Sequence, residues 1–177
     1  MKNATYYPDP IAERLRRAVV RAKREKAARG VELVAADFEQ IARKASPDEF
    51  ENIKTLLRER AAAINGQKPA EIPAFRYEDV YPRLEAGKYV LALELRQLQE
   101  DPELIVRVGL RDCLWQFSDE LPDVPTATWV FRAAADENGF FWVHLEDGTR
   151  CTSGQIVESA LETLSKFLEA DLLGLFS

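Results

Sequence analysis

Carboxylates are the residues of this sequence whose number and spacing could support chemistry. Eight acidic residues and a single base, Arg132, lie between positions 112 and 147. Two or three such side chains that converge can hold Mg²⁺ for phosphoryl chemistry, so a metal-dependent hydrolase is one hypothesis. Acidic residues are also common in turns and at helix ends, which makes a solvated surface the simpler interpretation. The eight residues are Asp112, Asp119, Glu120, Asp123, Asp136, Glu137, Glu146 and Asp147.

Nucleophiles and phosphate-binding loops give weaker signals. None of the eight glycines forms a G-x-S-x-G or G-x-G-x-x-G motif, and Gly87-Lys88 precedes Tyr89 where a phosphate loop needs Ser or Thr. His144 is the single histidine, which excludes sites built from several histidines. Thiolate catalysis would need His144 beside Cys113 or Cys151, but Cys113 lies in an apolar run and His144 on an aromatic strand. We therefore predict no catalytic residue, no metal and no cofactor.

Aromatic residues are concentrated in the same part of the chain. All three tryptophans fall within residues 115–142, together with four phenylalanines. Alternation along a strand at 140–145 gives both of its faces apolar side chains, and each face needs cover from a helix or from a partner. One face carries Phe140, Trp142 and His144, and the other carries Phe141, Val143 and Leu145. The predicted protein-binding surface joins four aromatic residues to four acids: Trp129, Phe131, Phe140, Trp142, Asp136, Glu137, Glu146 and Asp147.

Basic residues are concentrated at the other end of the chain. Residues 1–30 hold nine bases and three acids, a net charge of +6 within a chain of net charge −6. Arg14, Arg17, Arg21 and Arg24 recur at i, i+3, i+7 and i+10, which aligns them on one helix face able to contact successive phosphates. A nucleic-acid-binding regulator is therefore an alternative function. In the simpler interpretation these arginines are solvated or pair with the acidic part of the chain.

Helical elements are predicted to form the N-terminal part. An apolar stripe from Ile11 predicts a helix that stops at Gly30, and a second helix follows at 38–45. The segment Ser46-Pro47-Asp48-Glu49 is typical of a new helix start, and Asn65-Gly66 closes that third helix. We predict a helical segment over 1–66, a linker over 67–74 that contains two prolines, and an acidic, aromatic-rich unit over 75–177. The two parts are expected to pack together as one compact body.

The second part is predicted to be a mixed α/β unit, which gives an α+β fold. Residues 88–95 fit a strand, although a helix is also compatible with this short apolar run. Residues 102–120 fit a helix, although Leu104, Val106 and Val108 alternate as in a strand. Strands at 126–133, at 140–145 and near Cys151 form an antiparallel meander through hairpin turns at Asn138-Gly139 and Asp147-Gly148. Thr152, with Gln155 three residues later, caps a final helix.

Composition favours a cytoplasmic protein with no membrane span and no disulfide framework, because there is no long apolar run, no secretory signal pattern and only two cysteines. We therefore expect a non-enzymatic protein-binding protein, such as a regulator, an inhibitor or an adaptor. Its expected partner is another protein. A second copy of the chain is an alternative partner, bound through the aromatic sheet face or the apolar residues 172–176.

Overall fold

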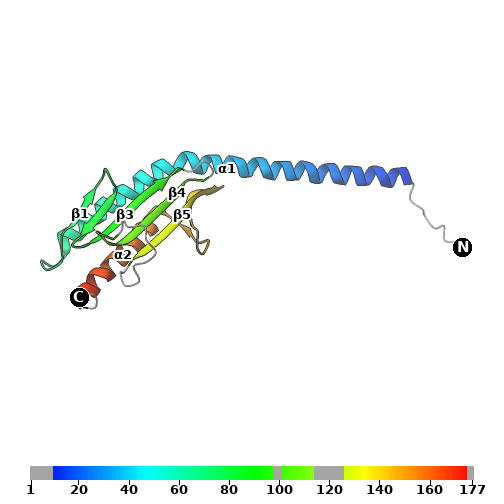
Figure 1. Cartoon of the computed structure of the whole chain (residues 1–177). Helices are drawn as coiled ribbons and strands as arrows, with labels where there is room; N and C mark the ends of the chain where they lie inside the picture. Colours follow the sequence, from blue (N-terminus) through cyan, green and yellow to red (C-terminus); the bar gives the residue numbers. More distant parts are fainter. Residues whose placement is uncertain (1–9, 98–100, 114–125, 175–177) are drawn as a thin grey trace. The chain divides into compact units, whose positions relative to one another are not determined.

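A computed structural model describes the backbone of residues 10–97, 101–113 and 126–174 (Figure 1). The chain divides into two compact units, Met1–Phe38 and Glu39–Ser177. Helix α1 (Pro10–Gln67) forms the described part of the first unit and the first element of the second. All core side chains among the described residues belong to the second unit.

Helix α1 is continuous, so the predicted helix ends at Gly30 and Ser46-Pro47 are wrong. An exposed glycine lowers helix stability by about 1 kcal/mol but does not stop a helix. Pro47 has no N–H to donate to the carbonyl of Arg43, four residues earlier. The hydroxyl of Ser46, which is fully buried, donates to that same carbonyl at 3.1 Å. Ser46 therefore supplies the hydrogen bond that Pro47 removes, which explains how the helix passes through the proline.

A seven-stranded antiparallel sheet follows α1, with neighbours in the order of the sequence from β1 to β7. This meander and the two helices confirm the predicted α+β fold. The strand at 88–95 and the three C-terminal strands are also confirmed, whereas β1 and β2 were not predicted. The strands are β1 (Phe75–Glu78), β2 (Arg83–Ala86), β3 (Tyr89–Arg96), β4 (Glu103–Leu110), β5 (Ala127–Asp136), β6 (Gly139–His144) and β7 (Arg150–Cys151).

Strand β4 lies within the helix predicted over 102–120, and that prediction is wrong for residues 103–110. Val106 pairs with Leu93 of β3 on one side and with Trp129 of β5 on the other. Alternate residues of β4 thus pack beside residues of β3 and β5 on the same face of the sheet. These contacts stabilise the strand, and they cannot be seen in the sequence of residues 103–110 alone. The remainder of the predicted helix, residues 114–120, lies outside the described residues.

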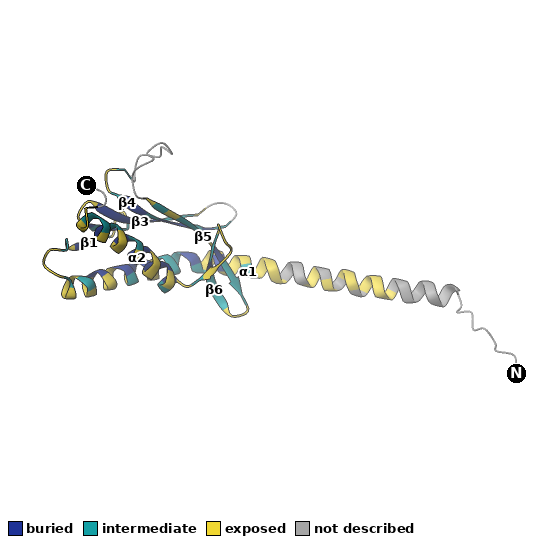
Figure 2. Ribbon diagram, turned by 90° about the horizontal axis from the view of Figure 1, so that it is seen from below, coloured by how far each residue is buried: buried dark blue, intermediate teal, exposed yellow. Residues whose placement is uncertain are grey.

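Both helices of the second unit cover one face of the sheet, where they form a single core (Figure 2). Helix α2 (Ser153–Leu172) begins with the predicted capping box, in which Thr152 and Gln155 exchange hydrogen bonds. Its predicted apolar stripe is confirmed as buried: Val157, Ala160, Leu161, Leu164 and Leu168. Residues 39–67 of α1 contribute Ile53 and Leu57 to the same core.

The opposite face of the sheet carries paired charges. Glu94 of β3 accepts hydrogen bonds from Arg96 at 2.8 Å and from Arg107 of β4 at 3.3 Å. The pKa of Glu94 is lowered, chiefly by its hydrogen bond with Arg96. Arg150 pairs with Asp136 at 2.5 Å and places its guanidinium 4.2 Å from the ring centroid of Phe141. The chain thus supplies polar cover for an aromatic ring on this face.

Candidate functional site

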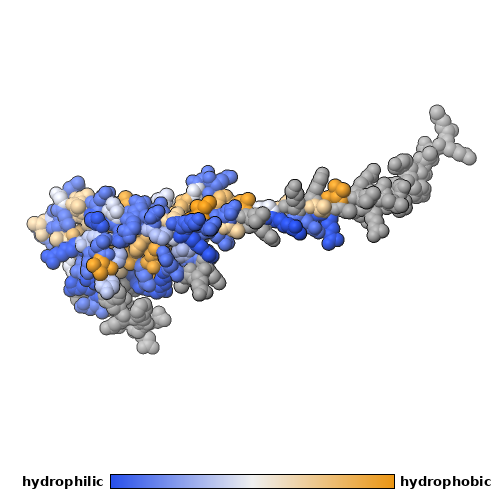
Figure 3. Space-filling model, turned by 90° about the horizontal axis from the view of Figure 1, so that it is seen from above, coloured by the Kyte–Doolittle hydropathy of each residue, from blue (hydrophilic) through white to orange (hydrophobic). Residues whose placement is uncertain are grey.

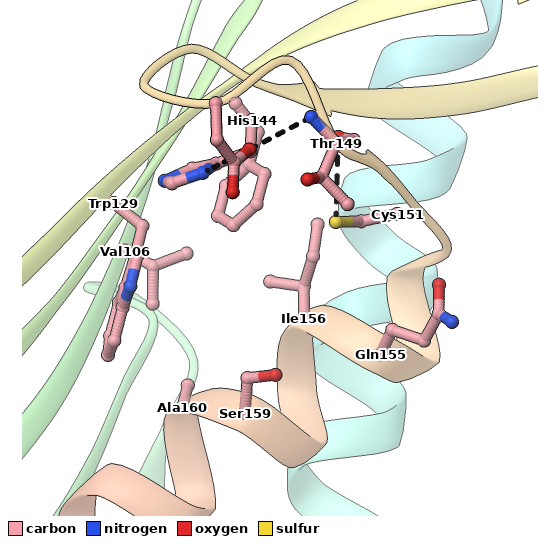
Figure 4. A pocket seen from close by; sticks show the side chains of 11 residues that line it. Val106, Trp129, His144, Thr149, Cys151, Gln155, Ile156, Ser159 and Ala160 are labelled. Atoms are coloured by element: carbon pink, nitrogen blue, oxygen red, sulfur yellow. Dashed lines mark hydrogen bonds and ion pairs between the residues drawn. The ribbon is translucent and has the colours of Figure 1, made fainter.

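A cavity of about 230 Å³ lies between the covered face of the sheet and the first turns of α2 (Figure 4). We call it the α2 pocket. Strands β4, β5 and β6 supply one wall, α2 supplies the other, and the turn between β6 and β7 lies at the opening. Its lining residues are Val106, Trp129, Phe131, His144, Asp147, Thr149, Cys151, Gln155, Ile156, Ser159 and Ala160.

The walls of the α2 pocket are apolar because sheet register and helix period bring buried side chains together. Val106 and Trp129 are directly opposite each other on β4 and β5, so they lie side by side on the covered face. Ile156 and Ala160 are four residues apart on α2 and therefore share one helix face, where both are buried. Trp129 is only partly buried, so part of its surface is accessible to a ligand.

A hydrogen-bonded group of polar residues lies at the opening of the pocket. Asp147 Oδ1 lies 2.9 Å from His144 Nδ1 and accepts the backbone N–H of Thr149 at 2.9 Å. The Thr149 bond, followed by the His144 bond, lowers the pKa of Asp147 to about 2. The turn also needs Gly148, whose φ of 73° is in the left-handed region.

This arrangement fixes the tautomer of His144 when its ring is neutral. Asp147 is ionised at neutral pH and can only accept, so the proton of the imidazole is on Nδ1. The other ring nitrogen, Nε2, then carries a lone pair. No described residue donates a hydrogen bond to Nε2. The ring of Phe131, 5.2 Å away between centroids, holds the imidazole from the side.

Cys151 lines the same pocket but is not activated as a nucleophile. Its Sγ lies 3.8 Å from the carbonyl of Thr149, and within the described part of the chain no hydrogen bond joins it to His144. Burial, and then the charge of Asp147, raise the pKa of this thiol. A raised thiol pKa opposes thiolate formation at neutral pH. Cys113, the other cysteine, lies in the turn after β4 and does not line the pocket.

The structure brings together three of the eight residues predicted for protein binding: Trp129, Phe131 and Asp147. Glu146 is next to Asp147 in the same turn and is exposed. Phe140 lies on the covered face, where its ring contacts Trp142 edge-on at 5.0 Å. Asp136 and Glu137 lie at the β5–β6 turn, at the opposite end of β6 from Asp147.

Trp142 is a core residue and offers no surface to a partner, since none of it is exposed. Its Nε1 donates to Ser153 Oγ at 3.3 Å, and Ser153 donates to Glu49 Oε2 at 2.7 Å. This chain of hydrogen bonds joins β6, α2 and α1, and two of its three groups, Trp142 and Ser153, are buried. Phe131 is also largely buried and is accessible only as part of the pocket wall.

Sequence reasoning missed the contribution of α2 to this site. Gln155, Ile156 and Ser159 line the pocket, and the sequence identified Gln155 only as a capping residue. Ser159 and Ile156 are three residues apart, so their shared face follows from the helical period. Which strand that face would meet depends on the sheet order, which the sequence does not reveal.

The carboxylates proposed as metal ligands are dispersed among separate turns. Asp112 follows β4, whereas Asp136 and Asp147 lie at opposite ends of β6. Within the described ranges, no three His, Cys, Asp or Glu side chains gather closely enough to hold a metal ion. Asp119, Glu120 and Asp123 lie outside the described residues, as do Trp115 and Phe117.

A second cavity, of about 440 Å³, borders β3 and the β1–β2 turn. Its lining includes Phe50, Tyr81 and Ile105. The charged residues at this cavity all form ion pairs, Glu94 with Arg107 at 3.3 Å and Arg83 with Glu78 at 2.5 Å. It therefore lacks the accessible, unpaired ring nitrogen that distinguishes the α2 pocket.

The arginine stripe lies on the described backbone of α1 in the first unit. Arg21 has 83% of its side chain exposed and pairs with Glu25 at 3.0 Å. Arg24 is exposed, and the side chains of Arg14 and Arg17 lie outside the described residues. Hydrophilic and apolar side chains both appear on the surface of this part of the helix (Figure 3).

The apolar C-terminus predicted to contact a second copy is described only as far as Gly174. Leu172 and Leu173, at the end of α2, are 60% and 70% exposed. Residues 175–176 of that predicted surface lie outside the described residues. A second copy bound there stays a prediction.

Comparisons of the chain with protein-family models, with curated proteins and with solved structures find no match. The geometry of the described residues is therefore the basis for inferring a function. Among these residues, no helix combines the length and the apolar character needed to cross a membrane.

Proposed function

We propose that this protein is a non-enzymatic, cytoplasmic protein-binding protein, acting as a regulator, an inhibitor or an adaptor through the α2 pocket. The observation that carries the proposal is the meeting of Trp129 and Phe131 with ionised Asp147 at one opening. Aromatic residues in pockets are the usual energetic centres of protein interfaces, and a charged rim selects the partner.

The size of the α2 pocket favours one side chain of a partner over a large cofactor. A cavity of roughly 150 Å³ accommodates a benzene ring, and drug-sized ligands occupy roughly 300–1,000 Å³. At about 230 Å³ the α2 pocket is suited to a single ring or a branched aliphatic group. The rest of the partner would then lie across the rim, where Asp147 is 59% exposed and Glu146 is exposed.

The polar groups of the pocket support binding more than catalysis. The thiol of Cys151 has a raised pKa and no hydrogen bond to His144, so the pocket lacks an activated thiolate. Asp147 is held by the turn and orients the imidazole. The imidazole is then available as a hydrogen-bond acceptor for a bound group.

Filling the pocket from its rim tests the proposal with little disturbance of the core. Ser159 is exposed on α2 and lines the pocket, so Ser159→Phe would place a ring in the space that the partner needs. Ser165→Phe makes the same substitution at an exposed position of α2 that does not line the pocket. We expect a partner captured from the native cell to be retained by the wild type and by Ser165→Phe, and lost by Ser159→Phe.

Glu146→Lys reverses a charge at the rim and should weaken binding of the same partner. Glu59→Lys, at an exposed position of α1, is its control. Thermal unfolding of each variant shows whether the fold is retained. Equal retention of the partner by Ser159→Phe and Ser165→Phe would refute a role for the α2 pocket.

A second candidate function is nucleic-acid binding by the first unit. The specific observation in its favour is the exposure of Arg21 and Arg24 on the helical arginine stripe. Residues 1–38 contain nine bases and five acids, a net charge of +4. Contacts from such a stripe to phosphates would release counterions and weaken steeply with salt.

A further inference from the structure

We infer that the α2 pocket binds the phenol ring of a tyrosine side chain that a partner protein presents beside basic residues. This inference depends on the proposed function, because it names the group that the pocket accepts. The hydrogen-bonding groups of the pocket, its apolar walls and the charge of its rim support it.

The first requirement is a hydrogen-bond donor, because His144 presents an acceptor. Its Nδ1–H is held by Asp147 at 2.9 Å, which leaves the Nε2 lone pair for a bound group. Only 14% of the His144 side chain is exposed, so a bound apolar ring would shield Nε2 from water. A ligand without a donor would leave that nitrogen desolvated and unpaired, which is unfavourable.

The second requirement is an acceptor that carries no negative charge. Trp129 has an indole N–H and Ser159 a hydroxyl, and neither side chain makes a hydrogen bond with any described residue. A hydroxyl group both donates and accepts, so it suits Nε2 together with these donors. A carboxylate or a phosphate would meet the negative charge of Asp147, and an ionised carboxylate also has no proton for Nε2.

The third requirement is a ring of limited size. Val106, Ile156 and Ala160 are buried, and their side chains give the pocket an apolar floor. Trp129 and Phe131 add aromatic surfaces, against which another ring packs edge-on or offset. A phenol ring combines this apolar body with one hydroxyl group.

The rim supplies the preference for basic neighbours. Glu146 and Asp147 are adjacent and exposed, and none of the described Lys or Arg residues lines the pocket. Lysine or arginine beside the tyrosine would therefore meet complementary charge, with an effect that salt weakens.

The first experiment compares 4-fluorophenol with 4-fluorotoluene by ¹⁹F NMR titration of the full chain. The two probes share a ring and differ in the hydroxyl. We expect 4-fluorophenol to bind about 3- to 10-fold more tightly, the effect of one net hydrogen bond. In His144→Phe this ratio should fall towards 1, and Ser159→Phe should prevent binding of both probes while Ser165→Phe does not.

The second experiment identifies the source of the phenol. The peptides acetyl-Lys-Tyr-Lys-amide, acetyl-Lys-Phe-Lys-amide and acetyl-Glu-Tyr-Glu-amide are titrated in the same way at low and moderate salt. The first should bind most tightly, and added salt should reduce its advantage over the acidic peptide. If 4-fluorophenol is preferred but no peptide competes with it, the pocket binds a free small molecule and the assignment to tyrosine is wrong.

The two proposals fail separately. Equal affinity for 4-fluorophenol and 4-fluorotoluene overturns the phenol inference, even if Ser159→Phe loses the captured partner. Preference for 4-fluorophenol with full partner retention by Ser159→Phe overturns the proposed function instead. If His144→Phe does not fold, the ratio of the two probes on the wild type still decides the inference.

Discussion

At the scale of single residues, Asp147 has two tasks that depend on the same oxygen. Its Oδ1 accepts from the Thr149 backbone, which closes the β6–β7 turn, and from His144 Nδ1, which sets the imidazole tautomer. The hairpin signal Asp147-Gly148 predicted this turn correctly. The bond to His144 could not be predicted, because it depends on how the turn folds back over β6.

Acid should weaken the fold through Asp147. The Thr149 and His144 bonds lower its pKa from 3.8 to about 2 in the folded state. A lowered carboxyl pKa stabilises the folded state fully above the unfolded value, and this contribution is lost as the pH falls from about 4 to about 2. Asp147→Asn should therefore lower the thermal midpoint at pH 6, and its difference from the wild type should shrink towards pH 2.

Glu146→Gln is the matched control, because Glu146 is the exposed neighbour in the same turn. Its midpoint should follow that of the wild type across the same pH range. A difference between Asp147→Asn and the wild type that stays constant from pH 6 to pH 2 would contradict the role assigned to this carboxylate.

At the scale of elements, local signals predicted the C-terminal half of the fold well. Turn glycines, β-branched runs and a capping box act over a few residues, and β5, β6, β7 and α2 all follow them. Strand β4 was missed because its alternation and a helical spacing are both present in the sequence, and only pairing with β3 and β5 decides between them.

The candidate site was less predictable than the elements. Trp129, Phe131 and Asp147 were identified from their type and clustering, and the structure places them in one pocket. Trp142 has the same aromatic character, but it faces the first turn of α2 and is buried there. Neighbours from distant parts of the chain determine which aromatic side chain is accessible, and one sequence does not reveal them.

Helix α1 gives a prediction about how a proline is accommodated. Ser46→Ala should destabilise the protein by about 1–2 kcal/mol, because the buried hydroxyl no longer donates to the Arg43 carbonyl beside Pro47. Pro47→Ala restores a backbone N–H for that carbonyl and should stabilise the helix. Urea unfolding of the two single variants and of the double variant measures the coupling.

The expected coupling is specific to this pair. In the Pro47→Ala background, Ser46→Ala should cost less than in the wild type, since Ala at 47 donates the bond that Ser46 otherwise supplies. Thr163→Ala on α2 is a useful comparison, because its hydroxyl also bonds a helix carbonyl, that of Ser159, with no proline nearby. Additive effects of Ser46→Ala and Pro47→Ala would show that Ser46 does not compensate for the proline.

At the scale of the whole molecule, charge separates between the two units. Residues 1–38 have a net charge of +4 and residues 39–177 a net charge of −10, which together give the chain's net charge of −6. The sequence predicted this asymmetry, since it needs only counting. The acidic unit holds the α2 pocket, whereas the basic unit contributes no side chain to the described core. Each unit therefore favours partners of opposite charge.

Salt-dependent binding to a short DNA duplex decides between the two candidate functions at this scale. If the arginine stripe contacts phosphates, replacing Arg14, Arg17, Arg21 and Arg24 by Ala should weaken binding and lower the slope of log K against log salt by roughly 3 to 4. The matched control replaces Arg43, Lys44, Arg76 and Lys166, exposed bases of the second unit. Tight, salt-sensitive binding lost only in the first variant would favour nucleic-acid binding over the proposed function. If the two variants weaken DNA binding equally, the stripe is not a specific phosphate site. Removing any four positive charges would then have the same effect, through net charge alone.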